Sequence, residues 1–94
     1  MSLHLMIEID LSVADIDVFD LYEGRSLRLL EEHGGNVIAR VRDVDEVREW
    51  HLLRLPSHAA WEAFRSDPRR ADLGWMLERA KVSVQRHEVW DVDR

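Results

Sequence analysis

The chain has 94 residues, of which 46% are hydrophobic and 34% charged, with a formal net charge of −6 and no cysteine. This composition is typical of one globular domain, spanning residues 1–94. The absence of cysteine excludes disulfides and thiolate chemistry, and the acidic balance argues against a nucleic-acid partner. No apolar run approaches the ~18 residues of a membrane span and no signal peptide is evident, so we expect no membrane association and a cytoplasmic location.

The first half of the chain predicts a strand, a helix and a second strand. Strict alternation over residues 3–10 indicates a strand whose aliphatic face carries Leu3, Leu5, Ile7 and Ile9. A helix is expected from about Val13 to His33, with Ser12 as its N-terminal cap. Gly34 and Gly35 should end it, because glycine tolerates the left-handed conformation that follows many helices. The next strand is expected over 36–42.

The second half predicts a strand, helices and a final strand. An acidic turn at 43–46 should form a hairpin between the second strand and a third at 49–55. Ser57 should cap a helix that breaks at Asp67-Pro68, where a new helix runs to about Arg79. A last strand is expected from Lys81 to Val92, with a bulge near residues 86–88. This order predicts a ferredoxin-like βαββαβ fold of class α+β, a four-stranded antiparallel sheet with helices on one face.

The third strand has apolar side chains on both faces, so both faces of the sheet need cover. Leu53 and Leu55 belong under the helices. The opposite face mixes charged residues with four large apolar ones: Met6, Ile38, Trp50 and Leu52. We therefore expect a homodimer in which two sheets pack face to face and enclose a polar-lined cavity.

A register for this opposite face follows from a turn centred on Asp45. It places Met6 beside Leu52 and Glu8 beside Trp50. It also places Arg40 opposite Trp50, so that one row across the sheet reads Arg40, Trp50, Glu8. The neighbouring row is Asn36, Arg54, His4.

Glu8 is the candidate catalytic residue, because a carboxylate enclosed between sheets could transfer protons. The alternative is that Glu8 only forms an ion pair with Arg40 or Arg54. Candidate ligand-binding residues are those expected to reach the cavity: His4, Tyr22, Arg40, Trp50, Arg54 and His87. His51 has the helix-facing parity of its strand and is interpreted as packed. His58 and Glu62 are too few to bind a metal, and we expect no metal or other cofactor.

Four short stretches carry a family resemblance: Tyr22 three residues before Arg25, the run Leu30–Gly35, the strand end Arg54–Ser57, and Phe64–Pro68. They resemble a widespread bacterial family of unknown function in the dimeric α/β-barrel superfamily, over residues 6–89. The resemblance implies a ferredoxin-like protomer that dimerises through its sheet. Cofactor-independent oxygenases of that superfamily use an Asn on the first strand with a nearby Trp and His. Trp50 and His58 could match the last two, but the first strand here has no Asn.

No residue set forms a catalytic signature, so the sequence does not decide whether the protein is an enzyme. The leading hypothesis is a dimer that binds a small metabolite in its sheet-lined cavity. One alternative is an enzyme of oxygenase or isomerase type that uses Glu8 as acid and base. The other is a structural or accessory interaction module without catalysis.

Overall fold

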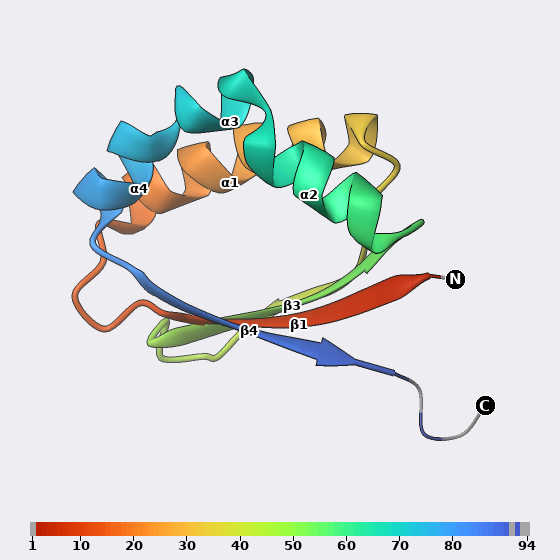
Figure 1. The fold of residues 1–94 in the computed structure, drawn as a ribbon. Coiled ribbons are helices and arrows are strands. Elements are labelled where there is room, and N and C mark those ends of the chain that lie inside the picture. The colour runs from red at the N-terminus through yellow and green to blue at the C-terminus, as the bar shows by residue number, and fades with distance from the viewer. Residues whose placement is uncertain (1, 91, 93–94) are drawn as a thin grey trace.

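The computed structural model describes residues 2–90 and 92. Its elements follow the expected order along the chain: β1 (Leu3–Asp10), α1 (Ile16–Glu32), β2 (Asn36–Arg42), β3 (Arg48–Leu55), α2 (His58–Ser66), α3 (Pro68–Ala71), α4 (Gly74–Ala80) and β4 (Ser83–Val89). The helices lie on one side of the sheet, and no other element of the described chain covers the opposite side (Figure 1). The ferredoxin-like α+β prediction is confirmed.

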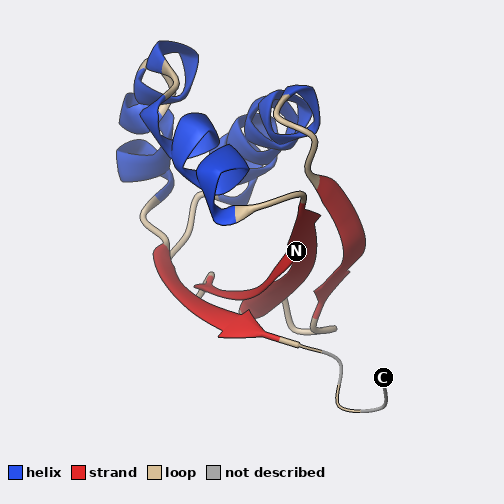
Figure 2. Cartoon of the chain, turned by 45° about the vertical axis from the view of Figure 1, so that its right-hand side comes forward, coloured by secondary structure: helices blue, strands red, loops and turns tan. Residues whose placement is uncertain are grey.

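The sheet has the order β2-β3-β1-β4, and every neighbouring pair is antiparallel. The curved sheet and the helical layer that covers one of its faces are both visible in Figure 2. The predicted register between β1 and β3 is confirmed, because Met6 pairs with Leu52 and Glu8 with Trp50. The aliphatic residues of β1 are buried under the helices, while their even-numbered neighbours lie on the open face.

The predicted register between β2 and β3 is wrong over most of its length. Val37 pairs with Leu53, but Ala39 pairs with Leu52, so Ile38 is an extra residue that forms a β-bulge. A one-residue shift moves the following side chains to the opposite face. Arg40 therefore pairs with His51, on the helix side, and Val41 takes the expected place beside Trp50. The predicted row Arg40, Trp50, Glu8 does not exist, although Asn36 does pair with Arg54.

The bulge predicted for the last strand is also absent, because β4 pairs with β1 without a shift from Ser83 to Val89. Val89 consequently lies on the open face. The predicted extension to Val92 passes through Asp91, which lies outside the described residues. β4 is an edge strand, and its helix-side residues Val84 and Arg86 are both exposed. The helices therefore leave this edge of the sheet uncovered.

Two helix boundaries differ from the prediction. Asp15, not Ser12, caps α1, and its carboxylate accepts a hydrogen bond from the Val18 amide at 3.2 Å. Asp10 accepts a hydrogen bond from the Ser12 amide, so this serine belongs to the loop. The helix that begins at Pro68 stops after one turn, and α4 begins separately at Gly74. The Ser57 cap of α2 is confirmed by a bond of 3.1 Å from the Ala60 amide.

The end of α1 depends on Gly34, which has a φ of +85°. A β-carbon there would lie 2.9 Å from Cγ of Pro56, at the end of β3. The close approach joins the end of α1 to the strand that follows the hairpin. Gly34 is therefore required both for its conformation and for its missing side chain.

We expect Gly34→Ala to lower the free energy of unfolding by about 1–2 kcal/mol, because alanine disfavours positive φ and meets Pro56. Chemical denaturation followed by circular dichroism measures the change. Gly24→Ala is the matched control, since no atom lies within 4 Å of its added β-carbon. That variant should gain up to about 1 kcal/mol from helix propensity. Equal effects of the two substitutions would contradict the role given to Gly34.

Candidate functional site

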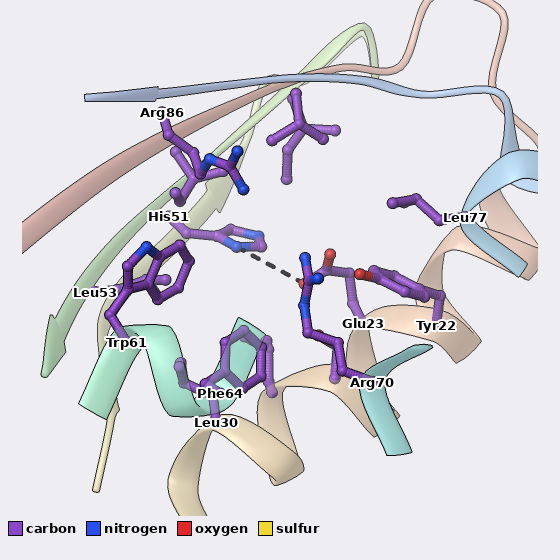
Figure 3. A pocket seen from close by; sticks show the side chains of 15 residues that line it. Tyr22, Glu23, Leu30, His51, Leu53, Trp61, Phe64, Arg70, Leu77 and Arg86 are labelled. Atoms are coloured by element: carbon purple, nitrogen blue, oxygen red, sulfur yellow. Dashed lines mark ion pairs between the residues drawn. The ribbon is translucent and has the colours of Figure 1, made fainter. Parts of the chain in front are cut away.

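A cavity of about 120 Å³ lies between the helices and the sheet. Its walls are mostly apolar and aromatic, with a few polar groups among them. The lining residues are Ile7, Ile9, Tyr22, Glu23, Ser26, Leu27, Leu30, His51, Leu53, Trp61, Phe64, Arg70, Leu77, Val84 and Arg86. Figure 3 shows the side chains of His51, Glu23 and Tyr22 on facing walls of this space. Mostly apolar walls with a few converging polar groups are typical of small-molecule sites.

The strand side of the site is built on Glu49, a carboxylate that is only 1% exposed. Arg40 donates to it through Nε at 2.9 Å, and Arg42 donates through Nε at 2.7 Å. Burial alone would raise the pKa of Glu49, but hydrogen bonds from His51, Arg40 and Arg42 lower that pKa to about 2. Glu49 is therefore an ionised, fully compensated group. Both arginines face it because of the bulge at Ile38.

His51 lies two residues further along β3 and is 3% exposed. Its Nε2 is 2.5 Å from an oxygen of Glu49. An ionised carboxylate can only accept, so Nε2 carries the proton and donates it to Glu49. In the neutral imidazole, Nδ1 then holds a free lone pair. Nδ1 points toward Glu23, with 3.8 Å between Nδ1 and Oε2 (Figure 3).

Glu23 comes from α1 and is buried opposite His51. Burial raises its pKa, against the smaller opposing effects of His51 and Arg40. The pKa values of the two carboxylates are therefore shifted in opposite directions. Hydrogen bonds lower the pKa of Glu49 to about 2, and burial raises the pKa of Glu23. Carboxylates whose environments separate their pKa values in this way, with a histidine between them, are equipped to move protons.

The mouth of the cavity is lined by cations and aromatic rings. Arg86 projects from β4 and stacks over Trp61 at 5.9 Å, and Arg70 stacks over Phe64 at 5.3 Å. His58 of α2 and Glu88 of β4 join across the nearby edge at 3.0 Å. Because Arg86 and Val84 are exposed as well as lining the cavity, the space opens to the surface along β4.

The predicted catalytic residue, Glu8, lies on the other face of the sheet. Its carboxylate accepts a hydrogen bond from Nε1 of Trp50 at 3.1 Å and lies 3.5 Å from Nη1 of Arg48. The Glu8 side chain is 31% exposed in the single chain. His4, Arg54 and His87 lie on the same face, as predicted. No part of the described chain covers these residues.

Two predicted ligand-binding residues belong to the helix side instead. Tyr22 lines the cavity against the sheet, and Arg40 supports it through Glu49. The prediction that Arg40 reaches an open-face cavity is wrong, because the Ile38 bulge reverses its direction. His51 has the predicted parity and is buried, but it also lines the cavity.

Four residues of the site were not predicted from the sequence: Glu23, Glu49, Arg70 and Arg86. The order of apolar and polar residues in the sequence did contain a signal for Glu23 and Glu49. Glu23 falls four residues after Phe19, on the buried stripe of α1, and Glu49 shares the parity of Leu53 on β3. Charged residues at positions that should be apolar indicate a buried polar site. Arg70 and Arg86 had no comparable signal.

Among the described residues there is no group of three or more His, Asp or Glu side chains placed to hold a metal ion. No helix in the described part of the chain has the length and apolar character needed to cross a membrane.

No protein-family model and no curated protein matches the sequence. Solved structures do match the fold. SnoaB, a cofactor-independent oxygenase from Streptomyces nogalater, superposes with a TM-score of 0.80 at 11% identity, over 96% of this chain and 92% of that one. A protein of unknown function from Rhodopseudomonas palustris gives 0.72 at 16% identity, over 96% and 83%. A NIPSNAP family protein of unknown function from Agrobacterium tumefaciens gives 0.67 at 10% identity, over 96% and 90%.

The chain is therefore a ferredoxin-like α+β protein with a cavity between its helices and its sheet. Its structural neighbours share the fold that the sequence resemblance implied. At 10–16% identity the neighbours establish the fold.

The pKa of Glu49 sets an expected pH dependence of stability. A carboxylate with a folded-state pKa of about 2 against an ordinary 4.5 stabilises the fold above pH 4.5. That stability, on the order of 3 kcal/mol, is lost as the pH falls toward 2. In Glu49→Gln we expect lower stability at neutral pH and a flatter dependence below pH 4.5. Denaturation at a series of pH values measures both.

Glu46→Gln is the matched control, because Glu46 approaches the same Arg42 at 3.6 Å but is exposed. An exposed pair of this kind contributes at most about 1 kcal/mol. A loss in Glu49→Gln no larger than in Glu46→Gln would show that the buried cluster is not the source of acid sensitivity.

Proposed function

We propose that the protein binds a small, largely apolar molecule in the helix–sheet cavity and removes a proton from it with His51. The observation that carries the proposal is the hydrogen bond of 2.5 Å between His51 Nε2 and the buried anion Glu49. It fixes the tautomer in which Nδ1 is free to accept a proton on the cavity side. This is the geometry of a general base oriented by a carboxylate.

The surroundings of His51 suit the charge that proton transfer would create. Accepting a proton makes an imidazolium, which the Glu49 anion stabilises from behind. Glu23 lies on the far side of Nδ1 and can return a proton to the substrate or receive one from it. The mostly apolar walls reduce the contact of His51 with water and so strengthen both interactions. The reaction class supported is proton abstraction, followed by reprotonation at another atom or reaction of the resulting carbanion.

This class includes isomerisation and the first step of oxygenation without a cofactor. The fold of SnoaB, described as a cofactor-independent oxygenase, supports the view that a chain of this architecture needs no added group for chemistry. The hypothesis of an acid–base enzyme is therefore retained, with His51 in place of Glu8 as the proposed base.

We also propose that two protomers pair through the open face of the sheet. Ile38 and Val41 are 51% and 56% exposed there, beside the half-buried Met6, Trp50 and Leu52. A contiguous apolar patch on a sheet face is typical of an interaction surface. Pairing would enclose Glu8 with His4, Arg54 and His87, and so form the second candidate site, in which Glu8 acts as the base.

The base can be identified with 5-nitrobenzisoxazole, which opens to a coloured nitrophenolate when a base removes its ring C–H proton. Wild-type protein should accelerate this reaction above the buffer rate. We expect His51→Gln to lower the rate at least about 100-fold, the usual contribution of a positioned base. Absorbance of the phenolate measures the rate.

Glu8→Gln distinguishes the two candidate sites, because Glu8 lies on the opposite face of the sheet. It should leave the rate unchanged if His51 is the base. If the rate is unchanged in His51→Gln and falls in Glu8→Gln, the base is Glu8, in the second candidate site between the two sheets. Circular dichroism of both variants controls for folding.

The paired state is tested by Leu52→Asp, which places a carboxylate in the centre of the open face. Burying that charge without a partner should raise the dimer dissociation constant at least about 100-fold. Sedimentation equilibrium measures the constant. Val44→Asp is the matched control, because Val44 is exposed in the β2–β3 turn. A wild-type protein that stays monomeric at micromolar concentration would overturn the pairing.

A further inference from the structure

The cavity has an uneven distribution of charge. Glu49 is compensated by Arg40 and Arg42, which also contact Asp20. Among the residues that line the cavity, Glu23 is the only carboxylate, and burial raises its pKa. Arg70 and Arg86 line the same space, and neither has a carboxylate within ion-pair distance among the described residues. The cavity therefore holds an excess of positive charge near its mouth.

Arg70 carries the clearest sign of a missing partner. Its Nε is fully buried and makes no hydrogen bond to any described residue. A buried donor without an acceptor costs about 1–3 kcal/mol, so native proteins rarely leave one. The guanidinium lies over the ring of Phe64, and that stacking uses its face. The N–H groups, which point outward in the plane of the guanidinium, stay available to an acceptor in the cavity.

Arg86 lines the same cavity, although its side chain is exposed. Its guanidinium lies over the ring of Trp61, and its own strand, β4, forms the open edge of the sheet. Burial, together with the nearby charges of Arg65 and Arg70, lowers the pKa of Arg86. Bringing two unpaired cations together is unfavourable unless an anion joins them. A bound anion would lower the repulsion and accept hydrogen bonds from both.

The cavity volume limits the size of that anion. An apolar protein cavity of about 150 Å³ holds one benzene ring, and the volume here is about 120 Å³ with an opening at the arginines. A single ring therefore fits among Leu30, Leu53 and Phe64, with its charged substituent at the mouth. The stacked Trp61 and Phe64, whose ring centroids are 5.5 Å apart, provide aromatic contact.

From this arrangement we infer that the ligand is a single-ring carboxylate, bound through its carboxylate by Arg70 and Arg86. The inference rests on the proposed function, because it names the ligand class of the same cavity. It makes the two arginines specificity-determining residues of that cavity.

The test uses two probes of the same shape, benzoate and the neutral benzamide, with the full chain labelled with ¹⁵N. Amide shifts in a two-dimensional spectrum identify the binding site and give each dissociation constant at low salt. Wild-type protein should bind benzoate at least about tenfold more tightly than benzamide, since a charge-assisted bidentate contact exceeds a neutral one. The shifts should fall on residues that line the cavity.

Arg70→Gln and Arg86→Gln should each remove most of this preference while leaving benzamide affinity unchanged. Arg70→Lys keeps the positive charge but loses the planar set of N–H donors of the guanidinium, and should keep only part of the preference for benzoate. Arg65→Gln is the matched control, because Arg65 stacks on the same Trp61 but pairs with Glu62 and does not line the cavity. It should behave as wild type.

Equal affinity for the two probes at the cavity would overturn the anion inference and leave the proposed site in place. A preference for benzoate that persists in both arginine variants, or that disappears in Arg65→Gln, would overturn it as well. If neither probe shifts any cavity residue at millimolar concentration, the proposed function itself fails. The comparison of benzoate with benzamide in the wild-type protein tests the anion inference even if one variant does not fold.

Discussion

The arrangement of the helix–sheet cavity depends on one buried charge, that of Glu49. A carboxylate that is 1% exposed is tolerated only when hydrogen bonds and opposite charges replace its lost hydration. Arg40, Arg42 and His51 supply them, and each contact has a consequence. The arginines join the edge strand β2 to β3 beneath α1. The histidine is held in one tautomer, which turns its second nitrogen toward the cavity. Removing the charge of Glu49 would release all three groups together.

Much of this fold follows from the sequence, because alternation and turn residues are local signals. The faces of β1 and β3 and their mutual register are set by side-chain period, and the end of α1 by Gly34. β2 is different. Val37 and Val41 have the same parity, which predicts a regular strand with both residues under the helices. The bulge at Ile38 instead sends Val41 to the open face and brings Arg40 to Glu49. The bulge allows Arg40 of β2 to pair with Glu49 of β3. A contact between two strands cannot be predicted from the residue pattern of either strand alone.

The candidate site was only partly predictable for the same reason. Glu23 and Glu49 interrupt apolar stripes, so their burial could be expected from position alone. Their pairing with His51 could not, because it joins α1 to β3 across the core. Arg70 and Arg86 come from α3 and β4, and only the folded chain places both of them along the wall of one cavity. The N-terminal cap of α1 is a smaller case. Ser12 and Asp15 both suit a cap, and the Asp10 side chain decides between them by accepting from the Ser12 amide.

The two faces of β3 connect the two proposals. Glu49 and His51 point toward the helices, while Trp50 and Leu52 point the opposite way, to the open face. A second protomer that packs on Trp50 and Leu52 would immobilise the strand that carries His51. The buried polar residues of β3, Glu49 and His51, both lie on the helix side, and its large apolar residues Trp50 and Leu52 lie on the open face. A domain of 94 residues has a small core, and placing a charged cluster inside it lowers the area available for apolar packing. Burial of the open face against a second copy would replace that area. Pairing through the sheet would thus complement the charged cluster beneath the helices, since it would supply stability that the buried charges remove.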